Sequence, residues 1–282
     1  MYLICPVCGG ALAGGRAEGA DGKAIFAPLR CGSGHCFDVS SKGYVNLLRS
    51  GGNHGDSAEM LEARRRFLGG GYYIPLSDAV IGAVGDILPD HCSVLDAGCG
   101  EGWYINRLDL AFGRKAGIAA VDVSPKAAAM TAGLFQKSER MRRVFCAAAS
   151  VNSLPVESGS VDVLLSIFSP LAPDEFSRAV RAGGLVIRAV PTARHLWQLK
   201  ETLYERPYEN DETPRPLPGF EPVSVRRVEY GMTVNGAEDI KALYSMTPYY
   251  RKTGSDDERK LLSLDRLDTE AGFIVTAYRR LN

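Results

Sequence analysis

The chain has 282 residues, and its 33 lysines and arginines are balanced by 33 aspartates and glutamates. With 45% hydrophobic and 23% charged residues, the composition is that of a folded globular protein and excludes a disordered, collagen-like or coiled-coil chain. No apolar run approaches the ~18–20 residues of a membrane helix, and the first residues lack a secretion signal, so we expect a cytoplasmic protein. The zero net charge excludes a generally basic nucleic-acid coat but leaves a local basic face open.

Four of the seven cysteines lie in the first 36 residues, at Cys5, Cys8, Cys31 and Cys36. An odd cysteine count without an export signal disfavours a disulfide framework. A Cys-x2-Cys turn places two thiolates side by side, and a second pair of ligands completes the tetrahedron of a structural zinc site. Adjacent residues seldom both bind one metal, so the fourth ligand is either His35 or Cys36. We prefer His35.

The chain divides into three expected parts. Residues 1–45 are expected to form a small zinc-binding module, which is too short to fold on a hydrophobic core alone. Residues 46–74 read as a glycine-rich linker followed by a connecting helix, with Asp56 or Ser57 as its cap. Residues 75–282 are expected to form the main domain.

From residue 93 onward, short apolar runs alternate with helical stretches. The expected strands are Ser93–Asp96, Lys115–Asp122, Arg143–Ala148, Val161–Ile167, Gly184–Ala189, Glu221–Tyr230 and Phe273–Arg279. This alternation predicts an α/β fold in which a mostly parallel sheet has helices on both faces. The two late strands predict an antiparallel edge. A further helix is expected from about Pro75 to Ile87.

A glycine-rich turn follows the first of these strands, with Gly98, Gly100 and Gly102 at alternate positions. Glycines let the backbone turn sharply and let a ligand approach without meeting a Cβ atom. Dinucleotide-binding folds prefer the spacing G-x-G-x-x-G, in which the helix N-terminus faces a pyrophosphate. Here the spacing is G-x-G-x-G after an acid, Asp96. This arrangement suits a ligand with a cationic centre and no phosphate.

The ends of the next two expected strands also carry residues suited to binding this ligand. Asp122 follows Gly102 by 20 residues, and a carboxylate there can accept both hydroxyls of a ribose. The strand after it ends in small residues, Ala149 and Ser150, which leave room for an adenine. As an ensemble, residues 75–200 resemble the Rossmann-like class I methyltransferases, which use S-adenosyl-L-methionine. The ensemble places the donor beside Asp96, Gly98, Gly100, Glu101, Gly102, Asp122, Val123, Ser124, Ala149 and Ser150.

A narrower resemblance extends from residue 5 to about residue 251. The matching stretches are Cys5–Cys8, His35–Asp38, Lys42–Leu48, Gly55–Met60, Ala63–Arg65, Asp96–Gly102, Arg194–Leu196 and Met246–Pro248. In these stretches the chain resembles the bacterial 23S ribosomal RNA (guanine-N1)-methyltransferases of the RlmA type. It departs from them in a longer loop between the second and third cysteines, and residues 166–170 match only loosely.

The resemblance has several implications. It places the fourth zinc ligand at His35, and it brings Tyr73, Gly100, Glu101 and His195 to the methyl donor. It also implies 23S ribosomal RNA as the partner and a guanine N1 in one of its hairpins as the acceptor. Some related members confer macrolide resistance. A homodimer remains open.

A neutral protein needs a local basic surface to hold RNA, and we expect Arg64, Arg65 and Arg66 to supply it. An extruded guanine could stack on an aromatic side chain. The aromatic candidates are Tyr72, Tyr73, Phe168, Tyr249 and Tyr250. Asp174 and Glu175 are the nearest acids that could serve as a base, but the sequence assigns this role to neither. Two alternatives stay open: a small-molecule methyltransferase with a structural zinc clip, and a non-enzymatic zinc-ribbon scaffold.

Overall fold

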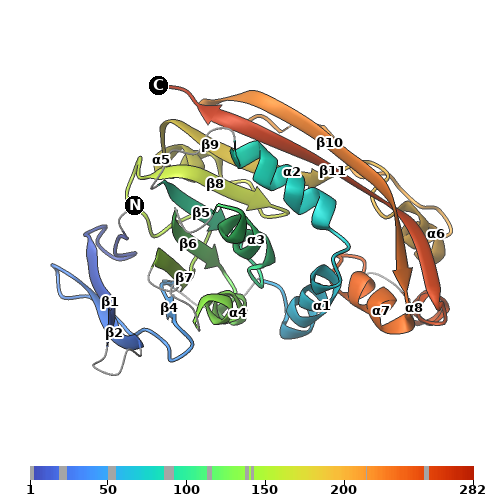
Figure 1. Ribbon diagram of the computed structural model, residues 1–282, viewed down its shortest axis with the longest axis horizontal. Helices are drawn as coiled ribbons and strands as arrows, with labels where there is room; N and C mark the ends of the chain where they lie inside the picture. The colour runs from blue at the N-terminus through green and yellow to red at the C-terminus, as the bar shows by residue number, and fades with distance from the viewer. Residues whose placement is uncertain are drawn as a thin grey trace.

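The computed structural model describes residues 3–18, 24–49, 55–85, 92–112, 116–136, 140, 143–213, 215–250 and 254–282. Within these residues the apolar runs form a sheet of order β10-β11-β9-β8-β5-β6-β7-β4 (Figure 1). Its strands are β4 (Tyr44–Asn46), β5 (Ser93–Ala97), β6 (Gly117–Asp122), β7 (Val144–Ala148), β8 (Val161–Ile167), β9 (Val180–Pro191), β10 (Phe220–Asn235) and β11 (Arg266–Arg280). Strands β4 to β9 are parallel, and β11 pairs antiparallel with β9 and β10. The expected mostly parallel sheet with an antiparallel edge is confirmed.

The central strands are buried on both faces, as expected for parallel strands written as continuous apolar runs. In β5, Val94 belongs to one hydrophobic cluster and Leu95 to the other, and both are fully buried. Helices α2, α3 and α4 contribute to the first cluster, and α5 packs into the second. The helices are α1 (Ala58–Gly69), α2 (Ile74–Gly85), α3 (Trp103–Ala111), α4 (Pro125–Phe135), α5 (Pro173–Ala179), α6 (Trp197–Leu203), α7 (Ala237–Ser245) and α8 (Ser255–Leu262). Helices therefore cover both faces of the sheet.

The N-terminal residues form a small antiparallel sheet of their own, made of β1 (Leu12–Glu18), β2 (Ala24–Cys31) and β3 (Cys36–Phe37). This N-terminal module lies beside β4 and β7, at the opposite end of the molecule from α7 and α8 (Figure 1). Its Leu29 is 2% exposed and packs into the second hydrophobic cluster. The backbone N–H of Ile4 also donates to the carbonyl of Pro155 at 3.0 Å. The module is therefore anchored to the main sheet.

Strand β4 joins the N-terminal module to the large sheet. Tyr44 pairs with Cys146 of β7, and the N–H of Leu47 continues the pairing to the carbonyl of Ala148 at 2.9 Å. A boundary at residue 45 consequently falls inside a strand of the large sheet, and residue 47 is buried. The division at residues 45 and 74 stays a prediction.

Local capping rules account for the helix that follows the linker. Ser57 is its cap, since its Oγ accepts the N–H of Met60 at 3.2 Å, so the cap is Ser57 rather than Asp56. Helix α2 begins at Ile74, one residue earlier than expected, and its described part ends at Gly85. The expected last turn, residues 86–87, and residue 115 of the expected second strand lie outside the described residues.

The antiparallel edge is longer than the sequence indicates. Strand β10 continues five residues past the expected end, Tyr230, and β11 begins seven residues before Phe273. In this extension Gly231 pairs with Glu270, and pairing runs on to Asn235. The two strands support each other beyond the end of β9, which local sequence does not reveal. Among the described residues no helix has the length and apolar character needed to cross a membrane.

Candidate donor and acceptor site

A cavity of about 1810 Å³ opens where β5, β6 and β8 end, which is where ligands bind in open α/β sheets. Eight of the twelve donor residues expected from the sequence line it: Tyr73, Gly98, Gly100, Glu101, Asp122, Val123, Ser150 and His195. Asp96, Gly102, Ser124 and Ala149 lie behind this wall, where they support it. The cavity also extends over residues that the sequence did not single out, at 211–213 and 215–219.

The turn from β5 to α3 requires glycine at two positions. Gly98 has φ +93°, and a Cβ there would lie 2.5 Å from the Cβ of Ser169. Gly102 has φ +86°, and a Cβ there would lie 2.7 Å from the Oγ1 of Thr131. At both positions the left-handed backbone disfavours a side chain, and a close neighbouring residue leaves no room for one. The backbone of the turn can therefore lie flat against the cavity. Thr131 adds a hydrogen bond at 2.9 Å to the carbonyl of Gly100.

Asp122 at the end of β6 is held by the same turn. Its Oδ2 accepts the N–H of Gly100 at 2.9 Å, and its Oδ1 accepts the N–H of Ser124 at 2.8 Å. Ser124 also caps α4 through its side chain. Each carboxylate oxygen keeps a second acceptor position. Asp122 can therefore accept two hydroxyl groups from a ligand without releasing its backbone partners.

Three acids gather beneath the turn and give the cavity its electrostatic character. Burial, followed by the charges of Asp122 and Glu101, raises the pKa of Asp96 to about 8. Burial also raises the pKa of Glu101 and the pKa of Asp122 above their ordinary values. Buried carboxylates resist ionisation unless a positive charge compensates them. These carboxyl groups therefore favour a cationic group of a ligand at this end of the cavity, where Arg64 already acts to lower the pKa of Glu101 and of Asp122.

One carboxylate oxygen in this group lacks a hydrogen-bond partner among the described residues. Glu101 is 5% exposed, and within the described residues its Oε2 has no hydrogen-bond partner. An ionised carboxylate of this kind is costly to bury unless a donor reaches it. Because Glu101 lines the cavity, the missing donor can be supplied by a ligand.

Tyr73 and His195 form a hydrogen-bonded pair that also lines the cavity. The Nδ1 of His195 accepts the N–H of Gly272 at 3.2 Å, so the ring proton must reside on Nε2. Nε2 then donates to the Oη of Tyr73 at 3.3 Å. Burial, followed by the charge of Lys200, lowers the pKa of His195 to about 3 and keeps the ring neutral. The hydroxyl hydrogen of Tyr73 is thereby left to point toward a ligand.

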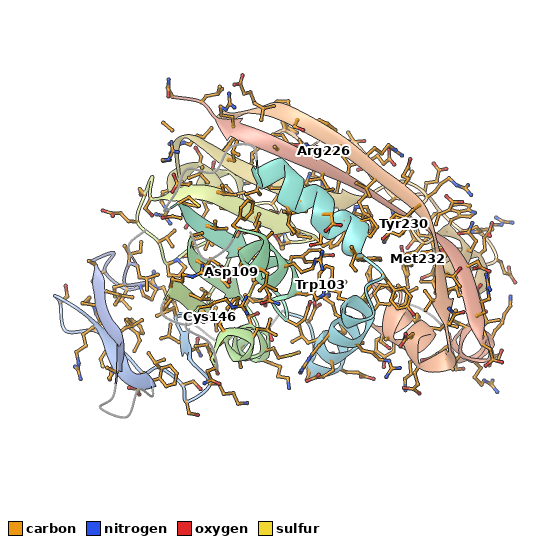
Figure 2. All side chains as sticks on the ribbon, viewed as in Figure 1. Trp103, Asp109, Cys146, Arg226, Tyr230 and Met232 are labelled. Atoms are coloured by element: carbon orange, nitrogen blue, oxygen red, sulfur yellow. The ribbon has the colours of Figure 1, made fainter. Side chains whose placement is uncertain are left out.

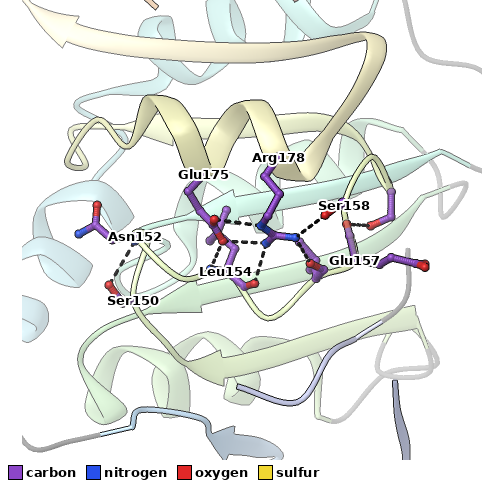
Figure 3. Close-up of polar contacts among 9 residues, drawn as sticks. Ser150, Asn152, Leu154, Glu157, Ser158, Glu175 and Arg178 are labelled. Atoms are coloured by element: carbon purple, nitrogen blue, oxygen red, sulfur yellow. Dashed lines mark hydrogen bonds and ion pairs between the residues drawn. The ribbon is translucent and has the colours of Figure 1, made fainter. Parts of the chain in front are cut away.

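The far end of the cavity is shaped by the loop after β7. Ser150 lies there, and the N–H of Ala149 donates to the carbonyl of Asp122 at 2.9 Å. Figure 3 shows how Arg178 of α5 holds this loop by donating to the carbonyl of Leu154, at 3.0 Å. Arg178 also donates to the carbonyl of Val156 at 2.7 Å. These hydrogen bonds hold the loop in place, and the loop residues that line the cavity are Ser150, Val151, Asn152 and Ser153.

Glu175, one of the acids considered as a base, belongs to the same loop support (Figure 3). Its Oε1 accepts the N–H of Leu154 at 2.6 Å, and it pairs with Arg178 at 2.7 Å. Neither Glu175 nor Asp174 lines the cavity. The structure thus gives Glu175 a supporting role.

Phe168 stands at the end of β8, in the wall of the cavity, and is 47% exposed. Its φ of +54° is a strained value for a bulky residue. The other aromatic candidates have partners or are buried: Tyr72 donates to Asp239 and Tyr250 donates to Glu59. The Phe168 ring is tilted against Phe273 at 5.9 Å between centroids, but its exposure makes it the candidate that a ligand can reach for stacking.

The three arginines expected to bind RNA diverge in the structure. Arg65 is 66% exposed beside Glu62. Arg66 pairs with Asp239 of α7 at 2.7 Å and so connects two helices. Arg64 turns toward the cavity. Arg140, outside this run, also has a structural role, because it pairs at 3.1 Å with the buried Asp109 of α3, which Figure 2 labels.

A separate cluster of metal-binding atoms lies in the N-terminal module, at Cys5, Cys8, Cys31 and His35, with all ligand atoms within 4.8 Å of one another. The Sγ atoms of Cys8 and Cys31 are 3.7 Å apart, and the Nδ1 of His35 lies 3.6 Å from Cys5 Sγ and 3.3 Å from Cys31 Sγ. A tetrahedral zinc with ordinary bond lengths has edges of about 3.8 Å between sulfurs and about 3.6 Å between sulfur and nitrogen. Cys36 is exposed and lies outside the cluster.

Residues 94–184 match a methyltransferase domain family. The crystal structure of the cyclase SpnF superposes with a TM-score of 0.50 at 18% identity, over 73% of this chain and 80% of that protein. This likeness shows the fold alone.

Three relatives carry names of one class. A Bacillus subtilis protein named as a 23S rRNA (guanine-N1)-methyltransferase is 34% identical over 71% of this chain and 68% of its own length. A Micromonospora griseorubida protein with the same name is 31% identical over 94% of this chain and 82% of its own length. The 23S rRNA (guanine(748)-N(1))-methyltransferase of Streptomyces fradiae is 32% identical over 72% of this chain and 68% of its own length.

Proposed function

The chain belongs to the family of 23S rRNA (guanine-N1)-methyltransferases, and we infer that S-adenosylmethionine and the target guanine meet in its large cavity. The protein is a methyltransferase that uses S-adenosylmethionine and acts on 23S ribosomal RNA. The observation that carries this proposal is the group of buried acids beneath a flat glycine turn, because it favours a cationic, phosphate-free nucleoside.

The donor is proposed to lie along the strand ends. Asp122 is suited to the ribose hydroxyls, since each of its oxygens keeps an acceptor position. Ser150 in the cavity wall and the small Ala149 behind it leave space for the adenine. The sulfonium carries its own reactive methyl group, so the protein mainly supplies alignment and excludes water, effects worth about 7–11 kcal/mol in favourable cases.

The guanine is proposed to enter from the side of Phe168. A base inside an RNA duplex is inaccessible, so enzymes that modify bases extrude them and stack them on aromatic rings. Phe168 offers an exposed ring in the cavity wall, and the Tyr73 hydroxyl offers a donor that can orient a polar edge. Phe168 and Tyr73 would then hold guanine N1 toward the methyl group that a bound donor supplies, and the N1 proton would leave to water as the methyl group is transferred.

The N-terminal module is proposed to hold a structural zinc ion through Cys5, Cys8, Cys31 and His35. Four protein ligands leave no open position, which is typical of structural rather than catalytic zinc. Pro6 of this module also lines the cavity. Zinc would therefore fix a segment at the edge of the site, where RNA must pass.

Primer extension on 23S ribosomal RNA tests the proposed function. Methylation of N1 removes a Watson–Crick donor, so reverse transcription should stop beside a single guanine after incubation with the protein and S-adenosylmethionine. Asp122→Ala is the matched control, and it should leave no stop. Transfer of the methyl group to small metabolites, with none to the RNA, would instead indicate a small-molecule methyltransferase.

A further inference from the structure

Helix α1 presents one face to the cavity, and the cavity wall includes its Met60, Arg64 and Leu68. These three residues are four positions apart, which is the spacing of a single helix face. Asp56, two residues before the helix begins at Ala58, lines the same wall. Arg64 lies directly over the glycine turn, because its Nη1 is 3.3 Å from where a Cβ on Gly100 would lie. Its side chain is only 26% exposed. Arg64 is thus placed at the donor site and away from the outer surface of α1.

Arg64 has two acidic neighbours, of which only Asp56 forms an ion pair with it. Asp56 pairs with its Nη1 at 2.5 Å, and Glu101 adds a second negative charge nearby. A guanidinium has five N–H donors, so Asp56 does not exhaust them. Glu101 in turn keeps its buried Oε2 without a partner among the described residues and faces the cavity. The group therefore offers donors for a carboxylate and an acceptor for an ammonium, a few ångströms from the glycine turn.

We propose that Arg64, oriented by Asp56, binds the α-carboxylate of the methyl donor, and that Glu101 binds its α-ammonium group. The inference rests on the proposed function, since it takes S-adenosylmethionine as the ligand. The free amino acid end of that molecule carries both charges on one carbon, which matches the pairing of one cation with one unpartnered acid. Arg64 is accordingly a donor-binding residue, and not part of an RNA-binding surface.

The segment before α1 helps to position Arg64. A Cβ on Gly55 would lie 3.0 Å from Val123 and Ser124, so this segment packs against the end of β6. Asp56 and the cap Ser57 follow immediately. The segment thereby holds Arg64 against both the ribose end and the amino acid end of the proposed donor site.

Calorimetric titration with two ligands tests the proposal. S-adenosylhomocysteine contains the amino acid end, whereas 5′-methylthioadenosine lacks it. Arg64→Gln should weaken S-adenosylhomocysteine binding roughly 10- to 100-fold, as loss of a charge-assisted pair does, and should change 5′-methylthioadenosine binding less than about 2-fold. Arg65→Gln, one position along the same helix and 66% exposed, is the matched control and should change neither.

The ligand can also be varied against the unchanged protein. The wild-type chain should bind decarboxylated S-adenosylhomocysteine at least about 10-fold more weakly than the parent compound, and this measurement does not depend on a variant folding. Equal losses for both ligands in Arg64→Gln, or an unchanged affinity for the decarboxylated compound, would overturn the proposal. Loss of 23S rRNA binding in Arg64→Gln, with S-adenosylhomocysteine affinity intact, would return Arg64 to the RNA surface. A failure of rRNA methylation with these ligand preferences intact would contradict the proposed function alone.

Discussion

Replacing His195 with glutamine should change how the stability of the ligand-free protein depends on pH. In the folded protein the ring is 8% exposed, its Nδ1 accepts a backbone N–H, and its pKa is lowered to about 3 from an ordinary 6.5. As pH falls below 6.5, the unfolded chain binds a proton on this histidine while the folded chain does not. The contribution of His195 is therefore complete above pH 6.5 and is lost as pH falls toward 3.

The magnitude follows from these two pKa values. Between pH 7 and pH 5 the unfolded state gains about 2 kcal/mol from protonation of this one histidine. Because pH 5 lies well above the folded-state pKa, the result depends mainly on the unfolded value. The free energy of unfolding of the wild type, minus that of His195→Gln, should fall by about 2 kcal/mol over this interval.

Urea unfolding at pH 7, 6 and 5 measures this difference, with linear extrapolation to water. Tyr73→Phe is the control, because it removes the hydrogen-bond partner of His195 without removing the titrating ring. Its curve should run parallel to that of the wild type. A difference between wild type and His195→Gln that stays constant from pH 7 to pH 5 would refute the assignment of a neutral, buried imidazole.

Three further sets of substitutions each have a specific expected outcome. Gly102→Ala should destabilise the protein by more than about 1 kcal/mol, because the new Cβ would have a positive φ and a close neighbouring side chain. Gly133→Ala is the control: this position on α4 lies in open space, so the substitution should stabilise the protein by up to about 1 kcal/mol. Thermal unfolding measures both changes. Arg178→Ala should leave two loop carbonyls unpaired and raise the KM for S-adenosylmethionine more than it lowers kcat; an unchanged KM would separate this loop from the donor site. Cys5→Ser should lose stoichiometric zinc by mass spectrometry, while Cys36→Ser should keep it, and equal loss would place Cys36 among the ligands.

The strand-end residues of the site could be predicted because their rules are local. Gly98 and Gly102 lie within one turn, where backbone sterics alone demand glycine. Asp122 ends a strand that neighbours the glycine turn, so parallel pairing brings it there. The cysteine spacing likewise predicted the cluster, and the three-dimensional arrangement then selects His35 over Cys36.

The role of Arg64 could not be predicted in the same way. Which face of α1 meets the cavity depends on contacts far away in the sequence, such as the pairing of Arg66 with Asp239. Three consecutive arginines look alike in sequence, although in the structure they point to three different surroundings. The four-residue spacing of Met60, Arg64 and Leu68 was the available signal. The long β10–β11 ladder escaped prediction for a related reason, since Gly231 and Gly272 stay in strands through cross-strand pairing.

The central claim is that the cavity at the strand ends is shaped for S-adenosylmethionine, and titration of the purified protein with that molecule tests it most directly. We expect one molecule bound per chain, competition by S-adenosylhomocysteine, and loss of binding in Asp122→Ala with the fold intact by circular dichroism. Absence of binding at saturating concentration, or preference for a phosphorylated dinucleotide that Asp122→Ala leaves unchanged, would contradict the account.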